Sequence, residues 1–368
     1  MDSSTIHVQV PGKLFVAGEY AVLERDQLAI VLAVNRYMTG TIQEASKHTI
    51  SLPQLGYDEI HFEVKKGEVF FSQNEKKFPF VRNALSIFYQ FLYEVGISPR
   101  PFRLTVTSEL DDKTGKKFGL GSSAAIVVTV ITALLNFYQC KMIRPSKELI
   151  YKLSAIIHYQ TQGNGSCADI AASTYGGWLS YQMFQPDWLI GELEGGTSLN
   201  ELVKMDWPSL YIKRISAPSR LSFAVGWTKT AASTAPMVSH VQKLKEEAPS
   251  LYEEFLLGSR RAVLQILDSF KRDDIDGAIE GFAENRRVLK KLSAYAKVDI
   301  ETPALKKFIE IANKYGSGKS SGAGGGDCGI AFVKDRQHID FMLKEWRDAN
   351  IEPLGLQLSN YGAIPSEE

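Results

Sequence analysis

The stretch KFGLGSSAAIVVTVITALL, residues 117–135, carries the strongest structural signal in this chain. Two glycines and two serines precede a long apolar run that begins at Ala124. Glycine lets the backbone turn sharply and approach a ligand, and serine is favoured at a helix start. The first amides of a helix lack internal partners and lie at the positive end of the helix dipole, so they attract phosphate. The stretch therefore predicts a phosphate-binding loop that opens a buried helix.

The same loop has other interpretations. It can be no more than a helix start with a tight entry turn. It is not a Walker A loop, because the required Gly-Lys-Ser/Thr ending is missing. It matches the dinucleotide pattern through Gly119, Gly121 and Ala124. A dinucleotide loop follows its strand directly, however, and here the polar segment Ser108–Lys117 intervenes.

The loop also lacks a feature of dinucleotide-binding proteins, and a hydrolase-like pattern occurs only elsewhere in the chain. No acidic residue occurs between Gln139 and Lys147, where a dinucleotide-binding protein carries its ribose ligand. A Gly-x-Ser-x-Gly pattern does occur at Gly318–Gly322, but there a predicted helix precedes it and a predicted strand follows. A nucleophile elbow needs the reverse order, so this pattern does not indicate a hydrolase.

Composition describes an ordinary globular chain. The 368 residues include 44% hydrophobic and 23% charged residues, and Lys+Arg and Asp+Glu both number 42. A balanced charge gives no global field to recruit nucleic acid, so any anion site is local. The N-terminus shows no secretory signal, and the longest apolar run, Ala124–Leu135, is too short to span a membrane. Three cysteines form no disulfide or metal framework, so we expect a cytoplasmic protein with reduced thiols and no membrane partner.

Periodicity predicts an α+β fold rather than a doubly wound sheet, because strands occur in runs with helices beside them. Expected strands are Ile6–Val10, Leu14–Val16, Ala29–Val34, Thr39–Glu44, Thr49–Leu52, Glu59–Val64, Phe102–Val106, Trp178–Tyr181, Leu210–Ile215, Leu221–Trp227, Cys328–Val333 and Glu352–Leu358. Expected helices are Phe80–Val95, Ala124–Tyr138, Lys147–Gln160, Pro236–Glu247, Leu251–Phe270, Ile275–Tyr295, Thr302–Tyr315 and His338–Ala349. A Gly-rich loop is expected over Gly316–Gly326. The domain boundary is placed near Pro218, giving domains 1–217 and 218–368.

A second segment of interest is Val10–Tyr20, which contains Lys13 at a strand break. A lone lysine is usually a solvated surface group. Apolar residues flank Lys13, however, and Gly18 and Glu19 follow it. A lysine held at a strand end is a suitable point charge for a phosphate, so Lys13 is a candidate phosphate ligand.

The third segment is Gly163–Ser173, in which Asp169 precedes small and apolar residues. Asp169 can simply cap the following helix. It can also act as a positioned carboxylate in a reaction. The fourth segment, Lys319–Cys328, has the composition of a flexible linker. Because it lies between a predicted helix and a predicted buried strand, it can instead present backbone amides to an anion.

Taken together and in this order, the segments resemble the GHMP kinase superfamily of small-molecule kinases. Pro11–Leu23 is similar to its first motif, Gly119–Ala125 to its phosphate loop and Ser321–Gly329 to its third motif. The resemblance implies an N-terminal domain like ribosomal protein S5 domain 2, a C-terminal α/β domain and an active site between them. Within the superfamily, Gly-x-Gly-Ser-x-x-Asp at Gly163–Asp169 makes the chain most similar to the bacterial phosphomevalonate kinases.

The resemblance implies transfer of the γ-phosphoryl group of MgATP to phosphomevalonate, with Lys13 and Asp169 as catalytic residues. The ATP-binding residues would be Lys116, Phe118, Gly119, Leu120, Gly121, Ser122, Ser123 and Ala124. The acceptor would be bound by Lys13, Lys117, Ser166, Ser321, Gly322 and Ala323. The partners would be these two small molecules, in a monomer or a homodimer.

The metal in such a reaction is Mg²⁺, and Ser123 is its candidate protein ligand. By alignment on Asp169, His158 occupies the position where mevalonate kinases carry a magnesium-binding glutamate. Neutral imidazole is a poor ligand for Mg²⁺, which prefers oxygen. The metal would then depend on phosphate oxygens, water and Ser123, with Glu19 orienting the Ser123 hydroxyl.

The role of Asp169 has two interpretations. The family would make it a general base. A phosphate monoester, however, has a second pKa of about 6, so the attacking oxygen is already largely anionic near neutral pH. Asp169 would then chiefly orient Lys13. Rival functions are mevalonate kinase or another GHMP kinase, a dinucleotide-dependent oxidoreductase, and a non-catalytic nucleotide-binding relative.

Overall fold

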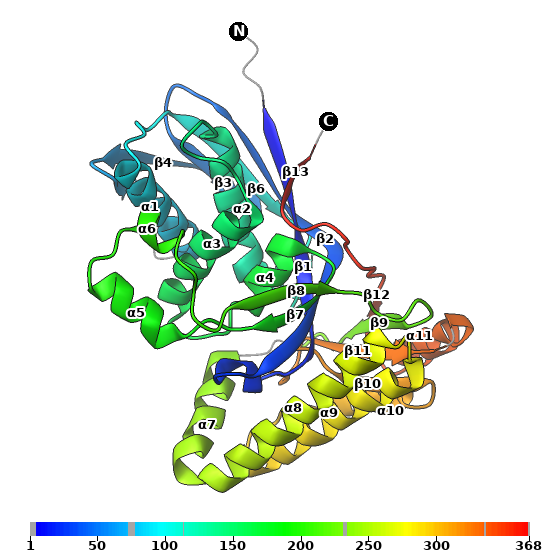
Figure 1. Ribbon diagram of the computed structural model, residues 1–368. Helices are drawn as coiled ribbons and strands as arrows, with labels where there is room; N and C mark the ends of the chain where they lie inside the picture. The colour runs from blue at the N-terminus through cyan, green and yellow to red at the C-terminus, as the bar shows by residue number, and fades with distance from the viewer. Residues whose placement is uncertain (1–4, 73–77, 113, 231–233, 335, 367–368) are drawn as a thin grey trace.

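The computed structural model describes residues 5–72, 78–112, 114–230, 234–334 and 336–366. Two sheets organise these residues, and each sheet carries its own layer of helices (Figure 1). Both helices and strands contribute throughout, so the predicted α+β class is confirmed.

The larger sheet contains nine strands within the described residues, in the order β13-β1-β2-β6-β3-β4-β5, with β7 beside β2 and β8 beside β7. All neighbours are antiparallel except β3 and β6, which are parallel. The strands are β1 Ile6–Ala17, β2 Leu28–Glu44, β3 Thr49–Leu52, β4 Tyr57–Lys65, β5 Glu68–Phe71, β6 Phe102–Ser108, β7 Trp178–Gln182, β8 Tyr211–Ile215 and β13 Ile364–Ser366.

Helices α1 to α4 pack together on this sheet, and α2 contacts both β1 and β2. Most residues of α2 are buried, as its apolar run predicts for a central helix. The helices of this half are α1 Pro79–Glu94, α2 Ser122–Phe137, α3 Lys147–Gln162, α4 Ala168–Tyr175, α5 Pro186–Glu194 and α6 Leu199–Leu202. Short 3-10 helices occur at η1 Ala21–Leu23 and η2 Pro53–Leu55.

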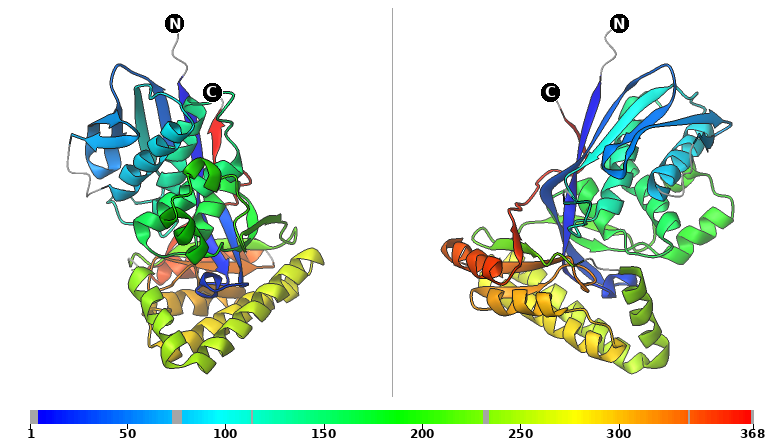
Figure 2. Two further views of the ribbon diagram at one scale, coloured as in Figure 1. Left: turned by 60° about the vertical axis from the view of Figure 1, so that its left-hand side comes forward. Right: turned by 180° about the vertical axis from the view of Figure 1, so that it is seen from behind.

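The smaller sheet has the order β10-β11-β9-β12 and is antiparallel throughout. The long antiparallel pair of helices α8 and α9 lies along this half of the molecule, and α9 contacts β10 (Figure 2). The ring of Phe282 in α9 stacks on Phe332 of β11 with 3.8 Å between ring centroids. Helices α10 and α11 form a separate apolar cluster with the sheet, in which Phe308 stacks on Trp346 at 4.3 Å. The elements are β9 Ser222–Trp227, β10 Gly316–Ser320, β11 Cys328–Val333, β12 Glu352–Leu354, α7 Thr234–Glu247, α8 Pro249–Lys271, α9 Ile275–Ala296, α10 Pro303–Ala312, η4 Arg336–His338 and α11 Ile339–Asp348.

The prediction of a Gly-rich loop over Gly316–Gly326 is wrong for the first half of that segment. Gly316–Ser320, expected to be part of a Gly-rich loop, is strand β10, which pairs with β11 from Gly316↔Val333 to Ser320↔Gly329. Glycine is needed at 318 because a Cβ there would lie 2.6 Å from the Cβ of Ala312 in α10. The glycines therefore serve close helix–strand packing rather than flexibility.

Two pairs of predicted strands are each continuous in the structure. The break expected at Pro11-Gly12 is a register shift inside β1, which continues to Ala17. Strand β2 likewise joins the two segments expected on either side of Asn35. Both strands are thus long enough to run from the larger sheet to the smaller half of the molecule (Figure 1).

The end of the described chain returns to the larger sheet. After β12, Leu358 bridges Val34, and β13 pairs with β1 from His7↔Ser366 to Gln9↔Ile364. We propose the division at residues 217 and 218 for the two halves, with residues 355–366 as a strap that crosses back to the first.

Candidate active site

A cleft of about 470 Å³ lies where β1, the start of α2, the start of α4 and the loop after β10 converge. The residues that line it are Lys13, Phe15, Glu19, Tyr20, Val22, Leu23, Phe80, Lys117, Gly119, Gly121, Ser122, Ser123, His158, Gln162, Gly165, Ser166, Asp169, Val238, Ser321, Gly322, Ala323, Gly324 and Asp327. The four segments singled out in the sequence therefore meet in one place. A larger hollow of about 870 Å³ beside β4 contains none of these segments.

The start of α2 has the features of an anion site. Gly121 is the N-cap residue of the helix and lies in the left-handed region with φ 82°, so no N-cap side chain bonds to the helix start. Gly119 is also left-handed, with φ 81°. The first turn has no acidic residue, so no carboxylate within that turn offsets the positive end of the helix.

Lys13 lies against this helix start. Its backbone amide donates to the carbonyl of Leu120 at 2.9 Å, and its ammonium donates to the carbonyl of Gly119 at 3.2 Å. The lysine therefore belongs to the wall that carries the phosphate loop, and the surface-lysine interpretation does not describe it.

Asp169 enters the cleft from the first turn of α4, where its Oδ1 accepts the amide of Ile170 at 3.0 Å. In the described residues no ion pair joins Asp169 to Lys13, although both line the cleft. The approach to α4 is held by Tyr181, whose hydroxyl donates to the carbonyl of Ser166 at 2.5 Å. Burial raises the pKa of Tyr181 well above its usual value, so this hydroxyl remains a donor.

The loop after β10 forms the opposite wall. Ser321 uses its hydroxyl twice on one residue: Oγ accepts the amide of Phe15 at 2.9 Å and donates to the carbonyl of Phe15 at 3.1 Å. Tyr20 donates to the carbonyl of Ala323 at 2.6 Å. Burial is the main reason that the pKa of Tyr20 is raised, with a contribution from the charge of Glu19, so the phenol stays protonated. The wall is thus anchored to the segment that follows Lys13.

Some of the expected ATP ligands do not line the cleft. The side chains of Phe118, Leu120 and Ala124 are buried, and the Phe118 ring packs between Arg36 and Trp227. Any contact of these residues with ATP would come from their backbone. Lys116 is exposed outside the cleft, and its amide donates to Asp112.

Lys117 is exposed and does line the cleft. Its backbone pairs with that of Asp111 in an isolated bridge. Burial raises the pKa of the Asp111 carboxyl, while the positive charge of Lys117 opposes that rise. Lys117 is therefore available as a cation at the edge of the cleft.

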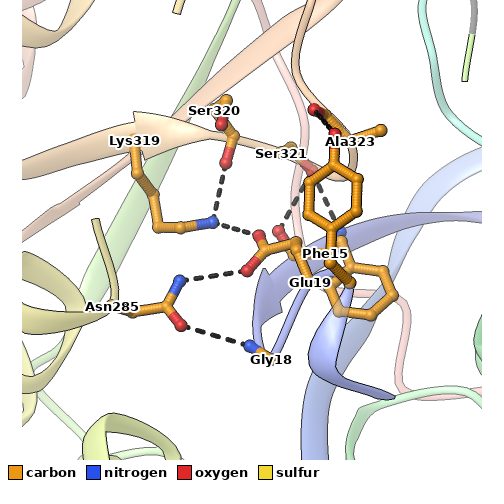
Figure 3. A network of polar contacts seen from close by, with 9 residues as sticks. Phe15, Gly18, Glu19, Asn285, Lys319, Ser320, Ser321 and Ala323 are labelled. Carbon is orange, nitrogen blue, oxygen red and sulfur yellow. Dashed lines mark hydrogen bonds and ion pairs between the residues drawn. The ribbon is translucent and has the colours of Figure 1, made fainter. Parts of the chain in front are cut away.

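The expected role of Glu19 is wrong. Its carboxylate does not bond Ser123, because one oxygen is engaged by the ammonium of Lys319 and the other accepts Asn285 Nδ2 at 3.0 Å (Figure 3). Sequence reasoning missed this arrangement, since Lys319 lies 300 positions away and Asn285 lies in a helix of ordinary pattern.

His158, in contrast, does lie beside Ser123. Its Nε2 is 3.5 Å from Ser123 Oγ, and its ring stacks on Phe80 with 5.3 Å between centroids. The side chain is 2% exposed, and its Nδ1 has no hydrogen-bond partner among the described residues. Asp327 also lines the cleft, and sequence reasoning did not select it; the lack of a side chain at Gly119 leaves room for it.

A loop of backbone amides at a helix start, a lysine beside it and a carboxylate in the same cleft define a phosphoryl-handling enzyme of the kinase class. Comparison with known proteins supports this assignment. The family models described as "GHMP kinases N terminal domain" and "GHMP kinases C terminal" match residues 80–177 and 266–352. The chain belongs to the GHMP kinase family, and it is an ATP-dependent kinase.

Individual relatives are similar over almost the whole chain. Phosphomevalonate kinase of Streptomyces sp. is 30% identical, with 96% of each chain covered. The solved structure of the Lin0012 protein from Listeria innocua has a TM-score of 0.93 at 37% identity, covering 99% of this chain and 100% of that one. Streptococcus pneumoniae phosphomevalonate kinase in complex with phosphomevalonate and AMPPNP has a TM-score of 0.82 at 29% identity, covering 97% and 100%. Mevalonate kinase of Methanocaldococcus jannaschii is 25% identical, with 96% and 99% covered.

In the described part of the chain, no helix has the length and apolar character to cross a bilayer. Nor do the described residues contain a group of three or more His, Cys, Asp or Glu side chains arranged to hold a metal. The oxygen donors in the cleft include the hydroxyl of Ser123 and the carboxylate of Asp169. Such a sparse set fits a Mg²⁺ ion that arrives on phosphates and keeps several waters, rather than an all-protein cage.

Proposed function

We propose that this enzyme transfers the γ-phosphoryl group of MgATP to phosphomevalonate, giving diphosphomevalonate and ADP. A phosphate oxygen of the acceptor forms a bond to the γ-phosphorus, and the bond from that phosphorus to the oxygen bridging to the β-phosphate breaks. The observation that supports this function most is the position of Lys13, which lies against the α2 phosphate loop in the same cleft as the loop after β10. The similarity to named phosphomevalonate kinases over 96% of the chain supports the choice of acceptor.

The donor side would be the start of α2. The amides near Ser122 and Ser123 and the positive helix end would hold the ATP phosphates. Mg²⁺ would supply charge neutralisation on those phosphates, and Ser123 would be its protein ligand. We propose that the ATP set of Lys116, Phe118, Gly119, Leu120, Gly121, Ser122, Ser123 and Ala124 acts mainly through the backbone, because the side chains of Phe118, Leu120 and Ala124 face the interior.

The acceptor would lie between Lys13, Lys117, Ser166 and the loop residues Ser321, Gly322 and Ala323. Two lysines in one cleft are suited to a substrate that is itself a phosphate. Ser321 would act by shaping the loop, since its hydroxyl already bonds the backbone of Phe15. Lys13 would neutralise charge that develops between the donor and acceptor phosphates.

The test is an ADP-release assay with MgATP and separate acceptors: phosphomevalonate, mevalonate, galactose and no acceptor. We expect turnover with phosphomevalonate to exceed that with every other acceptor. Preferred use of mevalonate would assign the mevalonate kinase function instead. Tight NAD(P) binding without phosphoryl transfer would favour the oxidoreductase alternative.

A further inference from the structure

A buried ion pair lies in the wall of the cleft, which Glu19 helps to line. Glu19 follows the end of β1, and Lys319 lies in β10; their side chains are 2% and 0% exposed. The ammonium of Lys319 donates to the Glu19 carboxylate and also to the carbonyl of Ser320 at 2.7 Å. Because two charges removed from water are costly unless fully paired, this contact is sensitive to the loss of either partner.

Asn285 of α9 completes the pair. Its Nδ2 donates to the second oxygen of Glu19 at 3.0 Å, and its Oδ1 accepts the amide of Gly18 at 3.2 Å. Figure 3 shows Asn285 and Lys319 reaching the carboxylate from two separate elements. Both oxygens of Glu19 therefore have partners, so this carboxylate is not placed to remove a proton from a substrate.

The pair lies between the two walls of the cleft. On one side, Glu19 is six residues after Lys13, and the chain between them contains Phe15. On the other side, Lys319 is the next-to-last residue of β10, and the loop that follows this strand begins at Ser321. The double hydrogen bond of Ser321 with Phe15 and the bond from Tyr20 to Ala323 reinforce the same connection.

From this arrangement we infer that Glu19, Lys319 and Asn285 are positioning residues, which fix the loop 321–324 relative to the strand that carries Lys13. This inference rests on the proposed function. Phosphoryl transfer depends on the alignment of donor and acceptor more than on covalent chemistry by the protein. A shift of about 1 Å between the two walls is enough to lower the rate by roughly 100-fold.

The experiment compares Glu19→Gln, Lys319→Met and the double variant Glu19→Gln/Lys319→Met with the wild-type enzyme. Each single variant leaves one buried group without its partner, so we expect both to lose thermal stability. The double variant removes the charges together, so it should regain most of that stability. We expect kcat in the double variant to remain roughly 10- to 100-fold below wild type at saturating substrates.

Amide hydrogen exchange gives a readout that does not depend on the acceptor. In the double variant, peptides covering residues 14–20 and 320–326 should exchange faster than in wild type, while peptides from α2 should not change. If wild type fails to use phosphomevalonate, the proposed acceptor is wrong, and the kinetic comparison is made with the acceptor that wild type does use. The exchange comparison tests the anchoring in either case.

Lys152 provides a matched control remote from the cleft. It is 2% exposed, bonds Glu148 and donates to the carbonyls of Val203 and Met205. Lys152→Met leaves the carbonyls of Val203 and Met205 without this donor, so it should lower stability without lowering kcat. The inference is overturned if kcat of the Glu19/Lys319 double variant returns to wild type together with its stability, or if exchange at residues 14–20 and 320–326 is unchanged.

Discussion

The side chain of Lys13 occupies the space that a side chain at Gly121 would need. A Cβ placed on Gly121 would lie 3.0 Å from Cγ and 3.1 Å from Cε of Lys13. Gly121 also has φ 82°, which other residues adopt only with strain. The glycine of the phosphate loop and the lysine of β1 are therefore fitted to each other, although 108 positions separate them.

Gly121→Ala is expected to lower both stability and activity. The left-handed backbone costs an alanine about 1–2 kcal/mol, and the new methyl group would in addition displace Lys13. Thermal unfolding and kcat measure the two effects. Gly96→Ala is the control, because Gly96 has φ 73° but a methyl group there meets open space. A loss of activity no larger in Gly121→Ala than in Gly96→Ala would contradict the fitted relationship.

Lys13→Met should nearly abolish transfer while the protein stays folded. Removing one preorganised charge from a transition state costs roughly 3–4 kcal/mol, or about 100- to 1,000-fold in rate. Single-turnover kinetics with MgATP measure this loss. Lys141→Met, at an exposed lysine that does not line the cleft, should retain its activity. Wild-type turnover in Lys13→Met would remove Lys13 from the mechanism.

Ser123→Ala should weaken the use of MgATP more than that of the acceptor. The hydroxyl stands at the start of the phosphate-binding helix, and loss of one bond to a charged group lowers kcat/KM for MgATP by roughly 10- to 100-fold. Separate titrations of the two substrates provide the measurement. Ser166→Ala, on the side of the cleft assigned to the acceptor, should show the opposite pattern. An effect of Ser123→Ala confined to the acceptor would show that the assignment is reversed.

Asp169→Asn should strongly lower the rate of phosphoryl transfer. The pH dependence of the remaining rate should follow the ionisation of the substrate phosphate. The second pKa of a phosphate monoester is about 6, so the rate should rise as that group ionises in both wild type and variant. A double-mutant cycle with Lys13→Met should give less than the sum of the single losses if the two residues act together. Additive losses, with a carboxylate-like limb missing only in Asp169→Asn, would instead establish Asp169 as an independent base.

The phosphate loop could be predicted from sequence because its chemistry is local. Gly119, Gly121 and Ser122 precede an apolar run, and a helix start needs no distant partner to attract an anion. Lys13 and Asp169 could be proposed as catalytic residues only because all four segments occur in the order of the family's motifs. The residues around Lys13 are also compatible with a surface lysine, and those around Asp169 with a helix cap. Local sequence alone therefore did not distinguish a catalytic role from these structural roles.

The contacts of Glu19 could not be predicted in the same way. A carboxylate after a glycine gives no sign that it is buried, and its partner lies on a strand that the sequence presents as a Gly-rich loop. Ser321 is a similar case, because a serine in such a loop suggests a ligand contact while its hydroxyl bonds the backbone of Phe15. The contacts of Glu19 and Ser321 both depend on long-range pairing, which local pattern does not encode.

The pairing of β13 with β1 has a consequence for synthesis in the cell. Residues 7–9 cannot pair with residues 364–366 until these have been synthesised. At a translation rate of 5–20 residues per second, the delay is roughly 20–70 seconds. During that time residues 7–9 of β1 have an uncovered edge, and an unpaired strand edge is a template for unwanted pairing with other chains. The larger sheet is therefore completed only after the strands of the smaller sheet have been synthesised, and this edge stays open to other chains until the strap pairs with β1.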